Sequence, residues 1–384
     1  MRFEFATANR IVFGTGTIRE LAPAAASLGK RALMVVGKSD ARAAAPRMAV
    51  EGAGVRCALF SVRAEPNIAT VQAGVSAARA EAFDMVIAIG GGSAIDAGKA
   101  IAAILPNPGE IRDYLEGVGH GQTLPKPSLP LIAVPTTAGT GSEVTRNAVL
   151  TVPDQRVKVS LRGPTLLPHL AIVDPELTYG LPPDVTAACG MDALAQLIEP
   201  YVSTEANPLT DALCLDGIGR IACSIRRACG DGEDAVARAD MALAALFSGM
   251  ALANAKLGAV HGFAGPIGGL CGAPHGAICG RLLPPVTRVN LRALRQRSPG
   301  SDTLKRYENL ARLLTGRADA TCDDGVQWLE VLCTDLGLPP LGAYGMSSKD
   351  LPEVISRAAH SSSMRGNPVV LTEAEMAGAL QAAL

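Results

Sequence analysis

The first half of the chain alternates between short apolar runs and longer segments whose apolar residues recur at helical spacing. Apolar runs at residues 32–36, 55–60, 85–89, 131–134 and 171–173 have the length of buried strands. Helical patterns occupy residues 18–28, 40–51 and 68–82, and residues 3–13 and 149–160 each predict a short hairpin. This alternation predicts a mainly parallel sheet with helices on both faces.

The pattern changes at Pro182 and Pro183. Beyond them helical periodicity continues to the end of the chain, and no segment alternates as a strand would. A chain of 384 residues exceeds what one hydrophobic core usually serves. We therefore predict a Rossmann-like α/β domain at residues 1–184 and an all-helical domain at residues 185–384. Ligands of such open sheets bind at the carboxyl ends of the strands.

Three glycines, at residues 90–92, separate the apolar run 85–89 from an alanine-rich helical segment. Glycine lets the backbone approach a ligand closely. Ser93 and Asp96 have the spacing of a capping box for a helix that begins near Ala94. The free N–H groups at such a helix start favour a phosphate. Because the segment matches neither common nucleotide fingerprint, these residues alone leave two interpretations open, a phosphate site or a sharp turn without a ligand.

A second glycine-rich loop makes the pattern specific. Residues 135–145 read PTTAGTGSEVT and follow another apolar run. Together with Gly-Met-Asp-Ala at 190–193, Asn207-Pro208 and the pair His261 and His275, they make the chain resemble the iron-containing (group III) alcohol dehydrogenase family. The resemblance runs from about Phe3 to Asn367-Pro368. It implies a dehydroquinate synthase-like fold and an NAD(P)-dependent enzyme that interconverts an alcohol and an aldehyde or ketone by metal-assisted hydride transfer.

The resemblance also implies which residues contact the dinucleotide. They are Gly37, Asn67, Gly91, Gly92, Ser93, Thr136, Thr137, Gly139, Lys158 and Leu177. At Gly37 many NAD-preferring relatives carry an acidic residue, so its absence leaves NADP as plausible as NAD, and Lys38 stands nearby. Without the resemblance, Asn67 reads as a turn residue and Lys158 as an exposed strand residue.

The candidate metal ligands lie in the second half. Asp192 and Gln196 are four residues apart, so they share a helix face. The interval between His261 and His275 contains Gly265, Pro266 and further glycines, which predicts two helical ends joined by a tight bend. One carboxylate and two imidazoles suit a catalytic Zn²⁺ or Fe²⁺ site.

The resemblance implies catalytic and metal-binding roles for Asp192, His261 and His275. It also exposes two departures, because Gln196 stands where the family has a fourth ligand, a histidine, and Gly265 where many relatives have a further histidine near the substrate. An amide oxygen is a weaker donor than imidazole, so we expect a lower metal affinity or a different metal. The proton route must then use water, a cofactor hydroxyl or His275.

These departures keep two alternatives open. One is a metal-independent reductase similar to the maleylacetate reductases, which share the fold. The other is a dinucleotide-binding protein that has lost catalysis. A stoichiometric metal favours the alcohol dehydrogenase over the first, and robust turnover eliminates the second.

Composition narrows the partners. A net charge of −1 and a pI near 6.5 give no field to hold nucleic acid or an anionic membrane, so we expect a small alcohol or aldehyde as partner. Nine cysteines without a C-x-x-C pair predict reduced thiols in a cytoplasmic protein, with little support for a catalytic thiol. The N-terminus shows no secretory signal, and the apolar residues 241–255 are too few to span a membrane, which predicts a buried helix. The resemblance implies a homodimer or higher homo-oligomer formed through residues 3–13.

Overall fold

The structure is a computed structural model that describes residues 2–38 and 41–384. The chain forms two compact units. The α/β unit comprises Ala6–Thr137 and Gly141–Tyr179, and the helical unit comprises Ala138–Thr140, Gly180–Leu384 and the described residues up to Phe5. Asp40, where one of the predicted helices was expected to begin, lies outside the described residues.

A parallel six-stranded sheet, in the order β1-β8-β5-β4-β2-β3, forms the centre of the α/β unit, as predicted. Its strands are β1 (Arg10–Phe13), β2 (Arg31–Val36), β3 (Arg56–Ser61), β4 (Met85–Gly90), β5 (Leu131–Pro135) and β8 (Leu170–Val173). Leu33 and Val35 of β2 enter the core on one face of the sheet, whereas Met34 and Val36 enter the core on the other. Burial on both faces explains why the strands read as continuous apolar runs.

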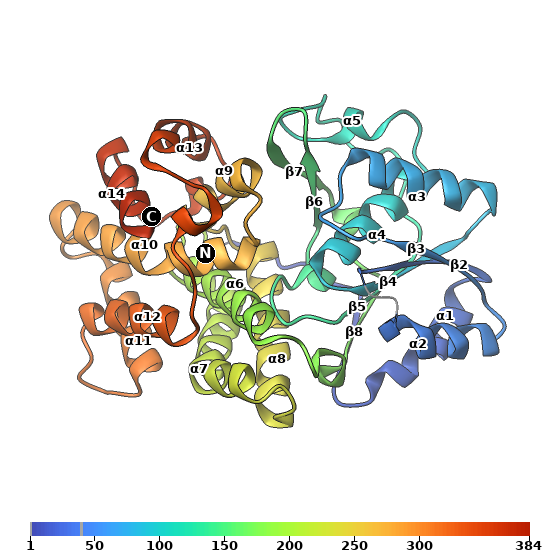
Figure 1. Ribbon diagram of the computed structural model, residues 1–384, viewed down its shortest axis with the longest axis horizontal. Coiled ribbons are helices and arrows are strands. Elements are labelled where there is room, and N and C mark those ends of the chain that lie inside the picture. Colours follow the sequence, from blue (N-terminus) through green and yellow to red (C-terminus); the bar gives the residue numbers. More distant parts are fainter. Residues whose placement is uncertain (1, 39–40) are drawn as a thin grey trace. The chain divides into compact units, whose positions relative to one another are not determined.

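Helices cover both faces of this sheet (Figure 1). The helices α3 (Ile68–Ala80) and α4 (Gly92–Ile104) pack on one face, and α1 (Leu21–Leu28) and α2 (Ala41–Gly52) on the other. Strands β2 and β4 are neighbours in the sheet, yet the helices that follow them, α2 and α4, go to opposite faces. Such a switch point is where open α/β sheets bind their ligands.

The outcome for the two predicted hairpins differs. The one at residues 3–13 is wrong, because only β1 forms there and it pairs in parallel with β8, Arg10 opposite Leu170. Strand β8, which lies about 160 residues later in the chain, supplies the backbone hydrogen bonds that a neighbouring hairpin strand would have supplied. The second hairpin is confirmed, since β6 (Asn147–Val152) and β7 (Val157–Arg162) form an antiparallel pair.

Short elements complete the α/β unit. They are the helix α5 (Ile111–Tyr114) and the 3₁₀ turns η1 (Thr17–Glu20), η2 (Ser142–Val144), η3 (Pro164–Leu166) and η4 (Pro175–Thr178).

The helical unit packs its helices around one large hydrophobic core. They are α6 (Pro183–Val202), α7 (Pro208–Gly230), α8 (Ala235–Asn254), α9 (Ala259–Cys271), α10 (His275–Arg297), α11 (Asp302–Thr315), α12 (Cys322–Asp335), α13 (Leu351–Ala359) and α14 (Glu373–Ala383), with the 3₁₀ turns η5 (Leu341–Tyr344), η6 (Ser348–Asp350) and η7 (Met364–Gly366). Within the described part of this unit, no strand occurs.

Helix α8 contains most of the apolar segment 241–255. Its 20 residues are long and apolar enough to cross a membrane, so the argument that this segment is too short was wrong. Of its most apolar window, 61% is buried, and the helix packs against α6 and α7. A core helix of the unit accounts for this burial.

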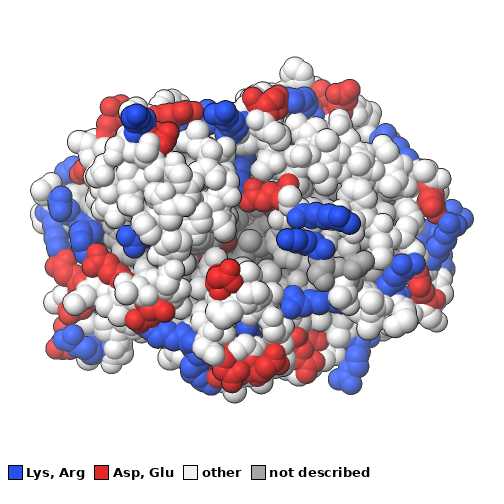
Figure 2. All heavy atoms as spheres, viewed as in Figure 1, with Lys and Arg blue, Asp and Glu red and all other residues white. Residues whose placement is uncertain are grey.

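Charged side chains of both signs are intermixed on the face shown in Figure 2. Ion pairs join charged side chains of opposite sign, such as Arg220 with Asp216 and Asp240. This mixture agrees with the net charge of −1 and with the expectation of small-molecule partners.

Candidate functional site

The glycine-rich turn after β4 leaves almost no room for side chains. Gly90 has φ +159°, and a Cβ on it would lie 2.7 Å from the Cβ of Ala94. A Cβ on Gly91 would lie 3.3 Å from the side chain of Thr137. Helix α4 begins at Gly92, the residue after Gly91. The first N–H groups of the helix and the positive end of its dipole therefore lie at residues 91–93, which are partly exposed. This arrangement suits a phosphate.

The predicted capping box at the start of α4 is wrong. The N-cap is Gly91, without a side-chain cap, and the helix starts two residues earlier than expected. The Asp96 carboxylate instead accepts hydrogen bonds from the Ser142 hydroxyl at 2.5 Å and from the Val149 N–H at 3.0 Å. One turn on, the buried Lys99 ammonium donates to Thr145. Helix α4 therefore anchors the loop at residues 135–145 as well as the glycine turn at residues 90–92.

Several of the predicted cofactor residues meet at the carboxyl ends of adjacent strands. Gly37 follows β2, and its backbone nitrogen lies 3.2 Å from where a Cβ on Gly90 would be. After β5, the Thr136 N–H donates to the Gly90 carbonyl, and Thr137 lies beside Gly91. Gly92 and Ser93 open α4 at the same edge. The sheet thus brings these positions together on both sides of its switch point.

Three other predicted positions have definite structural partners. Asn67 is the N-cap of α3 and its side-chain oxygen accepts from the Thr70 N–H. Leu177, in η4, packs against the core beneath the sheet. Lys158 lies 2.6 Å from Glu65 with only 8% of its side chain exposed, so it is not the exposed strand residue that its sequence also allowed.

Gly139 belongs to the helical unit rather than to the α/β unit. A Cβ on it would lie 2.9 Å from the Cα of Cys189, and its carbonyl accepts from the Ser248 hydroxyl. Close packing on α6 and α8 therefore accounts for a glycine at this position.

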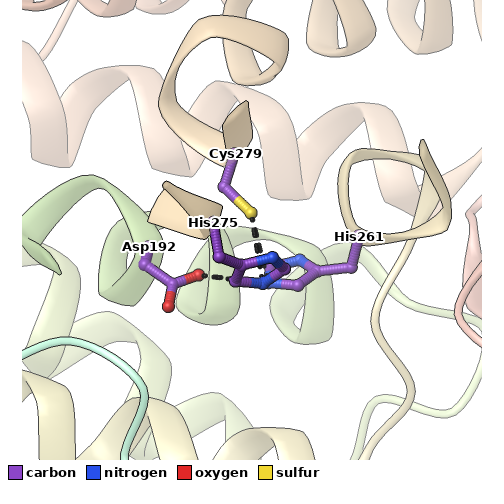
Figure 3. Close-up of side chains that lie close together, drawn as sticks. All are labelled: Asp192, His261, His275 and Cys279. Carbon is purple, nitrogen blue, oxygen red and sulfur yellow. Dashed lines mark hydrogen bonds and ion pairs between the residues drawn. The ribbon is translucent and has the colours of Figure 1, made fainter. Parts of the chain in front are cut away.

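In the helical unit, Asp192, His261, His275 and Cys279 direct their donor atoms toward one point (Figure 3). All four donor atoms lie within 4.8 Å of one another. Asp192 Oδ1 is 3.4 Å from His261 Nε2 and 3.7 Å from His275 Nε2. The three residues predicted from the sequence are thus brought together, as a common metal ion requires.

Glycines in α10 make this convergence sterically feasible. A Cβ on Gly276 would lie 2.0 Å from the Ala188 carbonyl oxygen, and one on Gly280 would lie 2.8 Å from the Met191 Cβ. The backbone of α10 therefore lies directly against α6. Because each glycine follows a donor residue in α10, the close approach brings His275 and Cys279 to Asp192.

The predicted tight bend between two helical ends is confirmed, but the expected break at Gly265 and Pro266 is wrong. Helix α9 runs unbroken from Ala259 to Cys271, through Gly265 and Pro266, and ends at Gly272 in the left-handed conformation, φ +64°. His261 lies in the first turn of α9, and His275 is the first residue of α10. A single reversal at residues 272–274 joins the two helices. Tertiary burial overrides the weak helix propensity of these glycines.

Glu199 was missed in the sequence, although it lies seven residues after Asp192 and thus on the same face of α6. Its buried carboxylate contacts His261 Nδ1 at 2.5 Å through one oxygen and accepts from the Val260 N–H at 2.6 Å through the other. A carboxylate at Nδ1 fixes the imidazole tautomer that presents Nε2 as a lone pair.

Gln196 lies one turn from Asp192 on α6, as predicted, and is buried. Its side-chain oxygen accepts a hydrogen bond from the Ser248 hydroxyl at 3.2 Å. That hydroxyl also lies 2.8 Å from the Ala245 carbonyl.

The donor cluster is electrostatically coupled. Burial alone would raise the pKa of Asp192 and of Cys279, but the imidazoles of His261 and His275 outweigh it and lower both. Burial alone would lower the pKa of each imidazole, but Cys279 with Glu199 or Asp192 raises both. Without an ion, the cluster therefore favours charged acids beside protonated imidazoles. An ion that binds there must displace these protons.

A Rossmann-like unit with a glycine turn at the start of α4, together with a helical unit that carries a candidate metal cluster, is typical of the dinucleotide-dependent dehydrogenases. Residues 8–175 match the iron-containing alcohol dehydrogenase family, and residues 186–384 match the C-terminal domain of the same family. The chain belongs to this family. It is an NAD(P)-dependent oxidoreductase that interconverts alcohols and aldehydes.

Individual relatives agree with this assignment. The chain is 36% identical to 1,3-propanediol dehydrogenase of Klebsiella pneumoniae, over 98% of this chain and 97% of that protein. It is 38% identical to alcohol dehydrogenase 4 of Saccharomyces cerevisiae, over 83% and 80%. A crystal structure of 1,3-propanediol oxidoreductase superimposes with a TM-score of 0.93 at 33% identity and covers both chains completely. Sulfoacetaldehyde reductase of Bifidobacterium kashiwanohense, solved with NAD⁺, gives a TM-score of 0.87 at 27% identity, over 100% and 99%.

Proposed function

We propose that the chain is a metal-dependent alcohol dehydrogenase in which Asp192, His261 and His275 hold a divalent ion. The convergence of their donor atoms, all within 4.8 Å, carries this proposal. By family resemblance Gln196 is a further candidate ligand. When bound, a divalent ion supplies a Lewis acid that polarises the alcohol or carbonyl oxygen of the substrate.

The residues of the chain prepare this site for the ion. Glu199 orients the His261 ring so that Nε2 faces Asp192. The His275 side chain is 33% exposed, compared with 6% for His261, so the site is more accessible on the side of His275. A substrate oxygen can therefore reach the ion from that side, while Asp192, His261 and His275 hold the ion in a fixed position.

The dinucleotide binds at the carboxyl edge of the α/β sheet in this proposal. The turn Gly91-Gly92-Ser93 receives the pyrophosphate, since its N–H groups begin α4. Gly37, Thr136 and Thr137 border the same edge. Asn67, Gly139, Lys158 and Leu177 complete the proposed contacts by family resemblance. Hydride transfer then requires the nicotinamide C4 to reach the carbinol carbon.

The proposed proton route avoids the two imidazoles, whose Nε2 lone pairs are used as ligands. At Gly265, where many relatives carry a histidine, a Cβ would have no heavy atom within 4 Å. Water or a cofactor hydroxyl therefore takes the alcohol proton.

The substrate class we propose is a small primary alcohol or its aldehyde. Among the relatives are a 1,3-propanediol dehydrogenase, a choline dehydrogenase and a 4-hydroxybutyrate dehydrogenase. Each of these names describes a short primary alcohol with a second polar group. A panel of such aldehydes with NADH and NADPH tests this class.

We further propose a homo-oligomer in the cytoplasm. Strand β1 is an edge strand of the sheet, and such edges pair with a second copy readily. The nine cysteines are free thiols, which suits a reducing compartment. Light scattering of the purified protein tests the oligomer.

The decisive experiment combines metal analysis with variants. Protein purified without chelator should contain about one Fe²⁺ or Zn²⁺ per chain. Asp192→Ala and His261→Ala should lose the metal and all turnover but keep dinucleotide binding. His360→Ala, an exposed histidine at the end of α13, is the matched control and should behave as wild type. Full activity without a metal, or in either variant, would contradict the proposal and favour a metal-independent reductase.

A further inference from the structure

Cys279 is the fourth member of the donor cluster, and it is completely buried. Its sulfur lies 3.7 Å from His261 Nε2 and 3.6 Å from His275 Nε2. It stands four residues after His275 in α10, so both side chains leave the helix on the same face. The sulfur thus points at the same lone pairs that Asp192 faces.

The spacing of these atoms fits a common ion. Zinc bonds of about 2.3 Å to sulfur and about 2.0–2.1 Å to nitrogen and oxygen, at tetrahedral angles, place sulfur and nitrogen about 3.6 Å apart and nitrogen and oxygen about 3.4 Å apart. The sulfur–nitrogen distances are 3.6 and 3.7 Å, and the nitrogen–oxygen distances are 3.4 and 3.7 Å. These four distances match those expected around a common ion, and the remaining two pairs of donor atoms lie within 4.8 Å.

Other cysteines of the chain have a different environment. The thiols of Cys57, Cys322 and Cys333 are buried as well, and each donates to a backbone carbonyl oxygen. The Cys279 sulfur instead lies within hydrogen-bond distance of the His261 and His275 imidazoles. Cys279 therefore differs from these three thiols in facing two imidazoles rather than a backbone carbonyl.

Gln196 is the competing candidate, and its contacts weaken its claim. Its buried side-chain oxygen lies 3.2 Å from the Ser248 hydroxyl, so a polar neighbour accounts for its burial without a metal. An amide is also a neutral donor. A thiolate, by contrast, is an anionic and softer ligand that Zn²⁺ binds readily.

We propose that Cys279, as a thiolate, is the fourth protein ligand of the metal in place of Gln196. This inference rests on the proposed function, since it adds a ligand to the same site. The ion would then have an Asp-His-His-Cys set, with the side beside the partly exposed His275 left for substrate. Thiolates favour Zn²⁺ over Fe²⁺, so the site should prefer zinc.

Cobalt provides a test that is independent of turnover. Co²⁺ bound to a thiolate gives an intense near-ultraviolet charge-transfer band that oxygen and nitrogen ligands do not give. The metal-free full-length chain is loaded with one equivalent of Co²⁺ and titrated with a competing chelator. Wild type should show the band, and Cys279→Ser and Cys279→Ala should lose it and bind Zn²⁺ at least about 10-fold more weakly.

Two control variants make the result specific. Cys214→Ala removes another fully buried thiol, from α7, and should keep both the band and the affinity. Gln196→Ala should keep the band. A wild-type protein that binds Co²⁺ without the band, or a Cys279→Ala variant with unchanged Zn²⁺ affinity, overturns the inference. Circular dichroism of each metal-free variant checks folding.

The same titration separates this inference from the proposed function. If Asp192→Ala and His261→Ala abolish Co²⁺ binding while Cys279→Ala keeps both the wild-type affinity and the band, only the thiolate ligand is refuted. If none of these variants changes Co²⁺ binding, the proposed metal centre itself is refuted.

Discussion

The Glu199→Gln substitution tests whether the carboxylate behind His261 supports the metal centre. Glu199 serves two nitrogen groups, His261 Nδ1 at 2.5 Å and the Val260 N–H at 2.6 Å. Glutamine keeps the shape but has only one acceptor oxygen, so one of these two groups must face an NH₂. If it is His261, the ring turns to the tautomer with a proton on Nε2, the atom that faces Asp192.

The expected magnitude follows from this contact. A buried hydrogen bond to a charged group contributes about 1.5–3 kcal/mol. Loss of such a partner behind a metal-binding histidine costs about 10–100-fold in affinity, or about 1.4–2.7 kcal/mol. We therefore expect the Kd for Zn²⁺ to rise by about 10–100-fold in Glu199→Gln, with dinucleotide affinity unchanged.

The assay is chelator competition at constant pH with the metal-free protein. Glu205→Gln is the control, because Glu205 is exposed and pairs only with Lys256 across 3.0 Å at the surface. A Kd within about twofold of wild type in Glu199→Gln would refute the reasoning, because the affinity would then not depend on this carboxylate.

Three further predictions follow from the packing. Relative to Gly37→Ala, Gly37→Asp should shift the ratio of the NADP and NAD Kd values at least about 10-fold in favour of NAD, because a carboxylate repels a 2′-phosphate. A Cβ at this position has no heavy atom within 4 Å, so both side chains fit. The same cofactor preference in the two variants would contradict this prediction. Gly276→Ala should destabilise the fold by about 1–3 kcal/mol, since its Cβ would lie 2.0 Å from the Ala188 carbonyl oxygen, whereas Gly265→Ala, with open space, should be neutral or stabilising in urea unfolding. Burial raises the pKa of Glu143 from 4.5 to about 7, so its neutral form stabilises the fold below pH 4.5 and this contribution is lost as the pH rises through 7. Glu143→Gln should therefore match wild type near pH 4.5 and exceed it by about 3 kcal/mol at pH 8, and an unchanged difference across this range would count against it.

The sequence by itself predicted the architecture and three members of the donor cluster. Continuous apolar runs fixed the strands of the parallel sheet because both faces of that sheet are buried. Helical spacing placed Asp192 on one face of α6, and motif order pointed to His261 and His275. These features are local, or repeat along the chain, so they can be recognised without coordinates of any neighbour.

Only the tertiary structure decided which side chains complete the cluster. Spacing of four residues put Cys279 on the His275 face of α10, and spacing of seven put Glu199 on the Asp192 face of α6, but periodicity does not say what a face meets. The close approach of α10 to α6 through Gly276, and the pairing of β1 with β8, depend on surfaces far apart in the chain. Contacts of that kind arise from packing, and no local pattern encodes them.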